Sequence, residues 1–273
     1  MREAAFVEHA AGRGILDMGR RQHFERVGQR EAGIDCRAGG LGRQTLAPCF
    51  RGQRISQGQP PLAAALEAYL GRRSAARVLA GPLRRDIGET IQAALLYADL
   101  RGFTVLSESN PPAAVISALD AWFDRIAGPV HAFGGEVLKF IGDGVLAIFP
   151  VVGEPRGACA AALRAVSAAR VGMSHLDKER QRQGLPPLPF GAAVHLGEML
   201  WGNIGAADRL DFTAIGPAVN LVSRLEGLCR PLDKTLLVSG AFAAETGMAL
   251  IPLGSHALRG IASPCAVFTV PES

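Results

Sequence analysis

Two aspartates stand beside apolar runs in the second half of the chain, where a charged side chain needs a reason. Asp99 follows the run IQAALLYA, and Asp143 lies in GGEVLKFIGDGVLAIFP, between the runs EVLKFI and GVLAIFP. The Gly-Asp-Gly between those two runs is typical of a tight hairpin turn, because Asp-Gly supplies the positive φ angles that the turn requires. A side-chain period of two directs Lys139 and Asp143 to one face. Charges at the end of a buried strand are costly without a task, so both are candidate functional residues.

The two carboxylates together indicate a cation site. A hard divalent ion such as Mg²⁺ takes oxygen ligands and often shares them with phosphate oxygens. The loop LRGFT contributes Gly102, Phe103 and Thr104, and its backbone amides could approach phosphates. For either aspartate alone, the alternative is a turn residue or a strand-end cap, because aspartate is favoured in turns. The pair beside this loop favours nucleotide binding.

A short helix is predicted over PAVNLVSRLEGL. Asn220 and Arg224 lie four residues apart and share one face, while the leucines at 221, 225 and 228 mark a second, apolar face. Arginine offers a planar fork of donors that suits phosphate oxygens, and asparagine can both donate to and accept from a ribose. The alternative is a polar face in contact with solvent.

The elements that must position these residues follow the order of a known supersecondary core. Strand, helix, two hairpin strands, helix and strand give the β-α-β-β-α-β order of a ferredoxin-like core. We therefore predict an α+β fold with that core, additional C-terminal strands, and a sheet flanked by helices. The predicted elements are a strand at 91–100, a helix with Asn110 as N-cap and two prolines in its first turn, the hairpin at 134–150, a helix at 155–182, a strand at 189–200, and strands in TLLVSG, MALIPLG and PCAVFTV.

Composition and charge divide the chain into three parts. The 273 residues are 48% hydrophobic, which is enough for one main core. Residues 1–60 hold 10 Arg and 6 acidic residues, which accounts for the whole net charge of +4, and they show no helix or strand period. We expect an N-terminal extension at 1–60 that is disordered or a small regulatory segment, a helical connector at 61–90, and the main domain at 91–273.

Several classes of protein are disfavoured by composition. Five scattered cysteines without a CxxC pair argue against a disulfide framework or a zinc knuckle and fit a reducing cytoplasm. No run of eighteen apolar residues occurs, and the first residues, MREAAFVEHA, lack the basic and then apolar order of a signal peptide. The N-terminal arginines lack interleaved aromatic residues. We therefore expect a cytoplasmic protein with no membrane span and no nucleic-acid partner.

Three blocks of the sequence resemble one family in both order and spacing. YADLRGFTVLSE, GGEVLKFIGDGVLAIFP and HLGEMLWGNIGAADRLDFTAIGPAVNLVSRLEGL are similar to the catalytic domain of the class III nucleotidyl cyclases, and the similarity continues through HALRGIASPCAVFTV. It covers about the last two-thirds of the chain. The resemblance implies an adenylyl cyclase that makes 3′,5′-cyclic AMP and pyrophosphate from ATP for intracellular signalling, with two Mg²⁺ or Mn²⁺ ions per active site. It also implies a homodimer whose two active sites each combine residues of both subunits.

The resemblance also implies a role for each matched residue. Lys139 and Asp143 would serve different active sites across the dimer. Two positions depart from the family pattern: Pro217 replaces the usual Asp or Asn at the start of the short helix, and Arg259 replaces a common lysine. The implied roles are Asp99 and Asp143 for the metals, Lys139 and Thr213 for the purine, Asn220 for the ribose, Arg224 for the transition state, and Arg259 for the triphosphate.

The choice of base can be argued from hydrogen bonding. Adenine presents an acceptor at N1 and a donor at its 6-amino group, which suit a lysine ammonium and a threonine hydroxyl. Guanine presents N1–H and a 2-amino group, which call for a carboxylate. Lys139 therefore favours ATP, and Thr213 resembles the family subset that bicarbonate or carbon dioxide can stimulate. The alternatives are a catalytically inactive homologue that binds nucleotide as a regulatory module, and a guanylyl cyclase.

Overall fold

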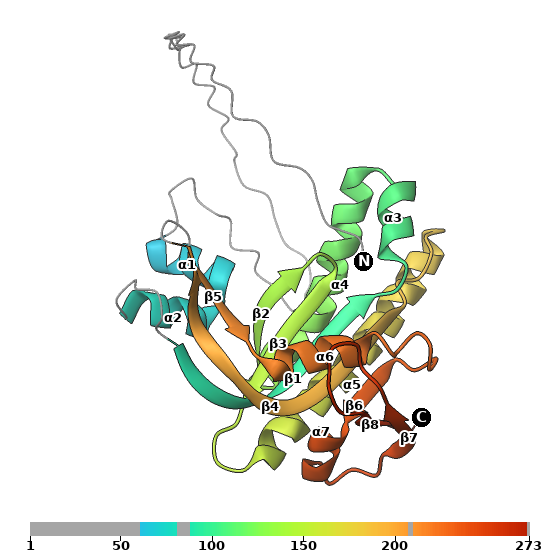
Figure 1. Ribbon diagram of the computed structural model, residues 1–273. Helices are drawn as coiled ribbons and strands as arrows, with labels where there is room; N and C mark the ends of the chain where they lie inside the picture. The colour runs from blue at the N-terminus through green and yellow to red at the C-terminus, as the bar shows by residue number, and fades with distance from the viewer. Residues whose placement is uncertain (1–60, 81–87, 207–209, 272–273) are drawn as a thin grey trace, which may run out of the picture. The chain divides into compact units, whose positions relative to one another are not determined.

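The computed structural model describes residues 61–80, 88–206 and 210–271 of the chain (Figure 1). The predicted N-terminal extension, residues 1–60, lies outside the described residues, and so do residues 81–87 of the predicted connector at 61–90. The last three residues of that connector, 88–90, are the start of a strand and not helical. Two short helices, α1 (Leu62–Leu70) and α2 (Arg72–Ala80), occupy residues 61–80 of that connector. No helix in the described ranges is long and apolar enough to cross a membrane.

A mixed sheet of eight strands forms the centre of the fold. Its order is β2-β3-β1-β4-β6-β8-β7, and β5 pairs with β4 beside this path. β1 and β4 run antiparallel side by side through the middle of the sheet (Figure 1). The strands are β1 (Gly88–Leu100), β2 (Glu136–Ile141), β3 (Gly144–Pro150), β4 (Phe190–Gly205), β5 (Leu210–Ile215), β6 (Leu236–Ser239), β7 (Ile251–His256) and β8 (Cys265–Thr269).

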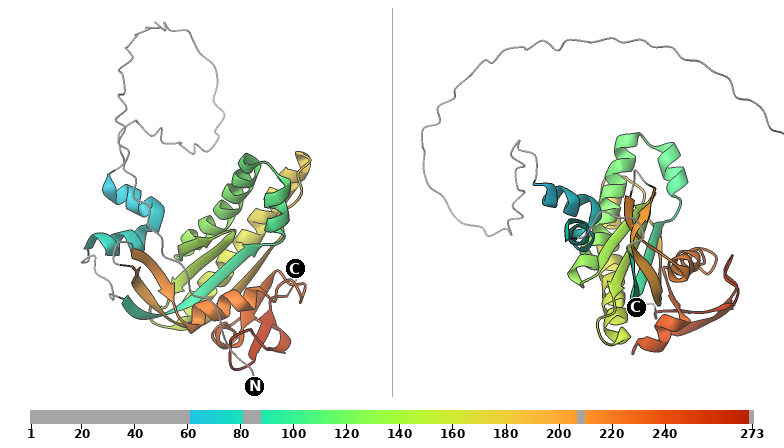
Figure 2. Two further views of the ribbon diagram at one scale, coloured as in Figure 1. Left: turned by 45° about the horizontal axis from the view of Figure 1, so that its top comes forward. Right: turned by 60° about the vertical axis from the view of Figure 1, so that its left-hand side comes forward.

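Helices cover both faces of the sheet. α4 and α5 share one apolar core with the sheet, and α6 shares a second core with the opposite face (Figure 2). The order β1-α4-β2-β3-α5-β4, with strands arranged β2-β3-β1-β4, confirms the predicted ferredoxin-like core. The helices are α3 (Phe103–Ser109), α4 (Pro112–Ala132), α5 (Pro155–Arg182), α6 (Pro217–Glu226) and α7 (Gly240–Glu245).

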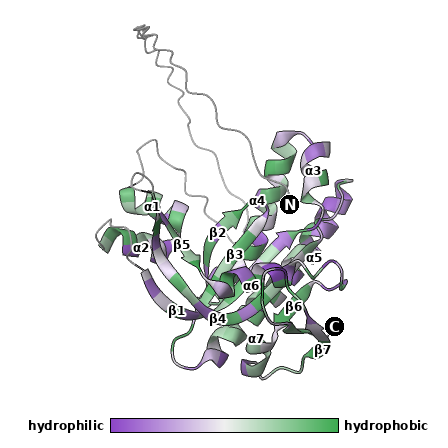
Figure 3. Ribbon diagram, viewed as in Figure 1, coloured by the Kyte–Doolittle hydropathy of each residue, from purple (hydrophilic) through white to green (hydrophobic). Residues whose placement is uncertain are grey.

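The central strands read as nearly continuous apolar runs because both of their faces are buried. In β1, Ala94 and Leu96 belong to the core under α4 and α5, whereas Ala93 and Leu95 belong to the core under α6. β3 is likewise coloured largely as hydrophobic in Figure 3. The alternation along β1 places Asp99 on the α6 face, the same face as residues 93 and 95.

Two local predictions were wrong. Asn110 is not the N-cap of the next helix: its Nδ2 donates to the carbonyl of Leu106 at 2.8 Å and closes α3, a helix that begins inside the predicted loop LRGFT and that the sequence did not predict. The N-cap of α4 is Pro111, without a side-chain hydrogen bond. In the hairpin, the positive φ of 63° belongs to Gly142 and not to Asp143, because glycine enters that region without a Cβ clash.

Candidate active site

A cavity of about 400 Å³ lies between the end of β1 and α6. It brings together three predicted site residues: Asp99, Asn220 and Arg224. Four further residues, which the sequence analysis did not single out, complete its wall: Tyr97, Ser223, Glu226 and Gly227.

α6 presents its polar side to this cavity because its apolar side is buried. Ala218, Val222 and Leu225 are at most 5% exposed and pack in the core under α6. The predicted apolar leucines also face this core: Leu225 is buried, and the leucines at 221 and 228 are partly buried against it. Asn220 and Arg224 remain exposed one turn apart. Pro217 occupies the first turn of α6, where a missing N–H has little effect, as predicted.

Asp143 reaches Asp99 through the pairing of β1 with the hairpin. The antiparallel register runs to Ala98 opposite Val145, so the next residue of β1 meets the hairpin turn. The turn is held from behind, since the indole Nε1 of Trp122 donates to the Asp143 carbonyl at 2.8 Å. The Asp99 and Asp143 carboxyl groups lie within hydrogen-bonding reach of each other.

Burial and mutual repulsion make this end of the sheet unfavourable for negative charge. Burial first, and then the hydrogen bond and charge of Asp143, raise the pKa of Asp99 from 3.8 to about 7. Burial likewise raises the pKa of Glu226 to about 7, although the nearby Arg101 opposes this shift. The pKa of Tyr97 rises to about 12, chiefly through burial and then through the charge of Asp99.

This donor set fits a hard divalent cation. The Oδ1 atom of Asp99 is buried without a hydrogen-bond partner among the described residues, and a cation would satisfy it. In the same part of the chain, no group of three or more His, Cys, Asp or Glu side chains forms a closed metal cage. Two carboxylates with remaining positions for water and phosphate oxygens match the way Mg²⁺ is bound in nucleotide enzymes.

A second group of polar residues lies on β2 and β5. Lys139 forms an ion pair with Asp211, while Thr213 is buried two residues further along β5. The sequence reading directed Lys139 and Asp143 to one face, but their side chains have different partners: Asp211 for the lysine, and Asp99 for the aspartate.

The remaining predicted residues are not gathered in either group. Arg259 is exposed in the turn after β7 and does not line the cavity at α6. Gly102 has a φ of 76° and an open position for a Cβ, and it precedes the first turn of α3. Phe103 packs against the core, whereas Thr104 is exposed. Their roles in binding substrate stay predictions.

Tyr97 and Glu226 could have been found by simple spacing. Tyr97 lies two residues before Asp99 and thus on the same face of β1. Glu226 is the last residue of α6 and lies four residues after the buried Val222. Because residues four apart share one helix face, its carboxylate was to be expected on the side of α6 that faces the sheet. Arg101 gave no such signal, because its Nη2 donates to the carbonyls of Cys229 (3.3 Å) and Lys234 (2.6 Å), more than a hundred residues away.

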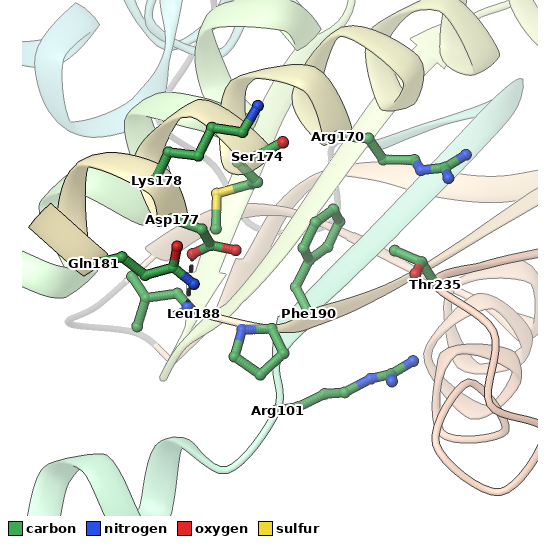
Figure 4. A pocket seen from close by; sticks show the side chains of 11 residues that line it. Arg101, Arg170, Ser174, Asp177, Lys178, Gln181, Leu188, Phe190 and Thr235 are labelled. Atoms are coloured by element: carbon green, nitrogen blue, oxygen red, sulfur yellow. Dashed lines mark hydrogen bonds between the residues drawn. The ribbon is translucent and has the colours of Figure 1, made fainter. Parts of the chain in front are cut away.

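A separate cavity of about 450 Å³ lies between α5 and the segment that enters β4 (Figure 4). Met173, Leu188 and Phe190 are among the residues that line it, and Figure 4 shows Arg170 above and Arg101 below the Phe190 side chain. None of the predicted site residues lines it. The candidate chemistry therefore belongs to the cavity at α6.

A family model described as the adenylate and guanylate cyclase catalytic domain matches residues 87–240. The chain belongs to this cyclase family. Among curated relatives of this cyclase, Adenylate cyclase 1 of Rhizobium meliloti (strain 1021) is 30% identical over 178 residues, 64% of this chain and 27% of that protein. Adenylate cyclase of Anabaena cylindrica is 30% identical over 154 residues, 55% of this chain and 30% of that protein. The chain thus spans less than a third of the length of these relatives.

Solved cyclase structures share the fold. The adenylyl cyclase CyaB from P. aeruginosa matches 68% of this chain and 97% of its own, with a TM-score of 0.63 and 27% identity. The guanylyl cyclase Cya2 matches 68% of this chain and 95% of its own, with a TM-score of 0.59 and 26% identity. A structure called an adenylyl cyclase and one called a guanylyl cyclase are thus nearly equally similar to this chain. The preference for adenine or guanine therefore has to be argued from side chains.

Proposed function

We propose that the protein is an adenylyl cyclase that converts ATP into 3′,5′-cyclic AMP and pyrophosphate. The observation that carries this proposal is the meeting of the Asp99 and Asp143 carboxylates beside the exposed Asn220 and Arg224 of α6. Asp99, Asn220 and Arg224 line one cavity, and Asp143 adjoins it through Asp99. A carboxylate pair, an amide and a guanidinium are groups suited to phosphoryl transfer from a nucleotide.

In the proposed reaction, the ribose 3′-oxygen attacks the α-phosphorus in line with the leaving group. The bond from the α-phosphorus to the bridging oxygen breaks, pyrophosphate leaves with that electron pair, and the 3′-hydroxyl proton passes to solvent. Asn220 would orient the ribose, and Arg224 would stabilise the charge that develops on the α-phosphate. Asp99 and Asp143 would hold two Mg²⁺ or Mn²⁺ ions, which lower the pKa of the hydroxyl and neutralise the phosphates when bound.

Base recognition would come from Lys139 and Thr213. The lysine would donate to N1 of adenine, and the threonine hydroxyl would accept from the 6-amino group. Arg259 would contribute a charge to the triphosphate, and Gly102, Phe103 and Thr104 would offer backbone amides. The active site would be completed in a cytoplasmic homodimer, in which the lysine and the metal aspartates of one chain face different nucleotides.

The test is turnover by the full chain, with ATP and with GTP, first in Mn²⁺ and then in Mg²⁺. Cyclic AMP and pyrophosphate are expected in equal amounts from ATP, and neither from Asp99→Ala/Asp143→Ala. The control is Asp120→Ala, which removes an exposed carboxylate on α4. A folded dimer that binds ATP but makes no product would point to the regulatory module, and product from GTP alone would point to a guanylyl cyclase.

Bicarbonate stimulation is a separate part of the proposal, and it rests on Thr213. Cyclic AMP formation should rise when bicarbonate is added at fixed pH and ionic strength. An unchanged rate would remove this part and leave the reaction itself untouched.

A further inference from the structure

A second cavity, the cavity at α5, lies apart from the cavity at α6 and has a volume of about 450 Å³ (Figure 4). The two cavities share no lining residue. One face of α5, from position 170 to 181, forms one wall, and the residue after β1, the segment that enters β4 and the residue before β6 form the others. Ligand sites for small molecules occupy about 300 to 1,000 Å³. The cavity is therefore large enough for a small molecule that does not displace the nucleotide.

Positive charge dominates the cavity at α5. Arg101, Arg170 and Lys178 line it, against a single acidic residue, Asp177. Oδ1 of Asp177 is already engaged, because it accepts the backbone N–H of Leu188 at 2.8 Å. Among the described residues, none of the three cations forms an ion pair. A concave surface with this excess of positive charge attracts an anion.

The Arg101 side chain is held in place, yet one of its donors has no acceptor. Its Nη2 donates to the carbonyls of Cys229 at 3.3 Å and Lys234 at 2.6 Å, and its backbone N–H donates to the carbonyl of Pro189 at 2.7 Å. Its Nε is buried without a hydrogen-bond partner in the part of the chain that the structure describes. A buried donor without a partner costs free energy, and hydrogen bonds from arginine to anions are among the strongest in proteins. An acid group bound beside Arg101 would give this nitrogen an acceptor.

Apolar side chains form another part of the wall. Met173 and Leu188 are each 2% exposed, Phe190 is 8% exposed, and Pro189 lies between the last two. The Phe190 ring also packs against Trp122, with ring centroids 5.2 Å apart, which fixes its position. A hydrated inorganic ion would leave this wall in contact with water, whereas an organic body would cover it. The wall therefore favours an acid with an apolar body over a bare inorganic ion.

The dipole of α5 indicates which end of the cavity receives the acid group. α5 ends at Arg182, so Gln181 lies in its last turn, where the helix carries partial negative charge. Figure 4 shows Thr235 between the Arg170 and Arg101 side chains, on the side of the cavity away from Gln181. Two guanidinium groups and a hydroxyl at that end can donate to carboxylate or phosphate oxygens.

We propose that the cavity at α5 binds a small organic acid, whose carboxylate or phosphate lies between Arg101 and Arg170 and whose apolar body packs against Phe190. This site is separate from the proposed nucleotide site, and the inference does not depend on the proposed reaction. Carboxylates and phosphates are recognised by the same donors, so both are tested.

The experiment measures binding to the full chain by isothermal titration calorimetry, without nucleotide. The probes are 2-naphthoate, 2-naphthyl phosphate, the neutral 2-naphthylmethanol and inorganic phosphate. The two naphthyl acids should bind about tenfold or more tightly than the alcohol, which lacks the charge, and than inorganic phosphate, which lacks the apolar body. Equal binding of the acids and the alcohol, or no binding of either acid, would overturn the inference.

Three variants locate the bound acid. Arg170→Gln, which removes a partly exposed cation that lines the cavity, should weaken both acids by about tenfold and leave the alcohol unchanged. The matched control is Arg164→Gln, on the same helix but outside this cavity, which should bind like the wild-type protein. Arg224→Ala, at the cavity at α6, should also retain binding.

The outcomes separate this inference from the proposed reaction. An equal effect of Arg170→Gln and Arg164→Gln would overturn the inference, and so would loss of acid binding in Arg224→Ala, which would place the acid at the nucleotide site. Thermal unfolding shows that each variant compared is folded. Because binding is measured without nucleotide, a chain that makes no cyclic AMP would refute the proposed reaction and leave the acid site standing.

Discussion

Asp99 should weaken the metal-free fold, and replacing it with asparagine should stabilise the protein. Its folded pKa of about 7 lies above its ordinary value of 3.8, so the folded state holds its proton more tightly than the unfolded chain does. The stability that protonated Asp99 contributes to the fold is therefore fully present below pH 3.8 and is lost as the pH rises toward 7. Asparagine has nearly the same shape and does not ionise, so the gain from Asp99→Asn should grow across that window.

The magnitude follows from the two pKa values. Each pH unit between them corresponds to about 1.4 kcal/mol, or about 4 kcal/mol over the whole window. Because Asp99 is half-buried and solvent screens part of this penalty, about 2 kcal/mol is a better figure. For a domain of this size, a gain of about 2 kcal/mol from Asp99→Asn raises Tm by about 6 °C at pH 8. At pH 5 only about a third of the penalty has developed, so the expected gain in Tm is about 2 °C.

The assay is thermal unfolding in EDTA at pH 5 and pH 8, with Asp120→Asn on the surface of α4 as the control. Adding Mn²⁺ at pH 8 should stabilise the wild-type protein and have little effect on Asp99→Asn, which reverses their order. A Tm gain that is equal at the two pH values, or no gain at pH 8, would refute the assignment of an ionised, unfavourable carboxylate at the end of β1.

Three further predictions concern the same site. Arg224→Ala should lower kcat by about 10²- to 10³-fold with a smaller change in KM, because the proposed reaction uses its charge in the transition state; steady-state kinetics beside Arg230→Ala test this. Trp122→Phe should lower the free energy of unfolding by about 1 kcal/mol and weaken Mn²⁺ activation, since Asp143 loses the bond that holds its turn; urea unfolding and a metal titration test this. Removal of divalent ions by EDTA should abolish cyclic AMP formation, and Mn²⁺ should restore it; residual activity would contradict the carboxylate site.

Local sequence patterns were sufficient for the framework of the site. The apolar runs, the Gly-containing turn and the helical spacing of Asn220 and Arg224 depend on neighbouring residues, so they are readable before folding. The same is true of the ferredoxin-like order of elements. Helix boundaries were less readable, because Asn110 can begin one helix or close another, and only the hydrogen bond to Leu106 shows which it does.

Tertiary structure decided which charges meet. Asp99 and Asp143 are 44 positions apart in sequence, and their contact follows from the antiparallel register of β1 and β3. Lys139 is paired with Asp211 because β5 folds back beside β2. The pKa values of Asp99 and Glu226 depend on burial by segments far along the chain. Residue type and spacing thus determined which groups were available, whereas their electrostatic state was set by the low-dielectric surroundings that form only when distant strands pack together.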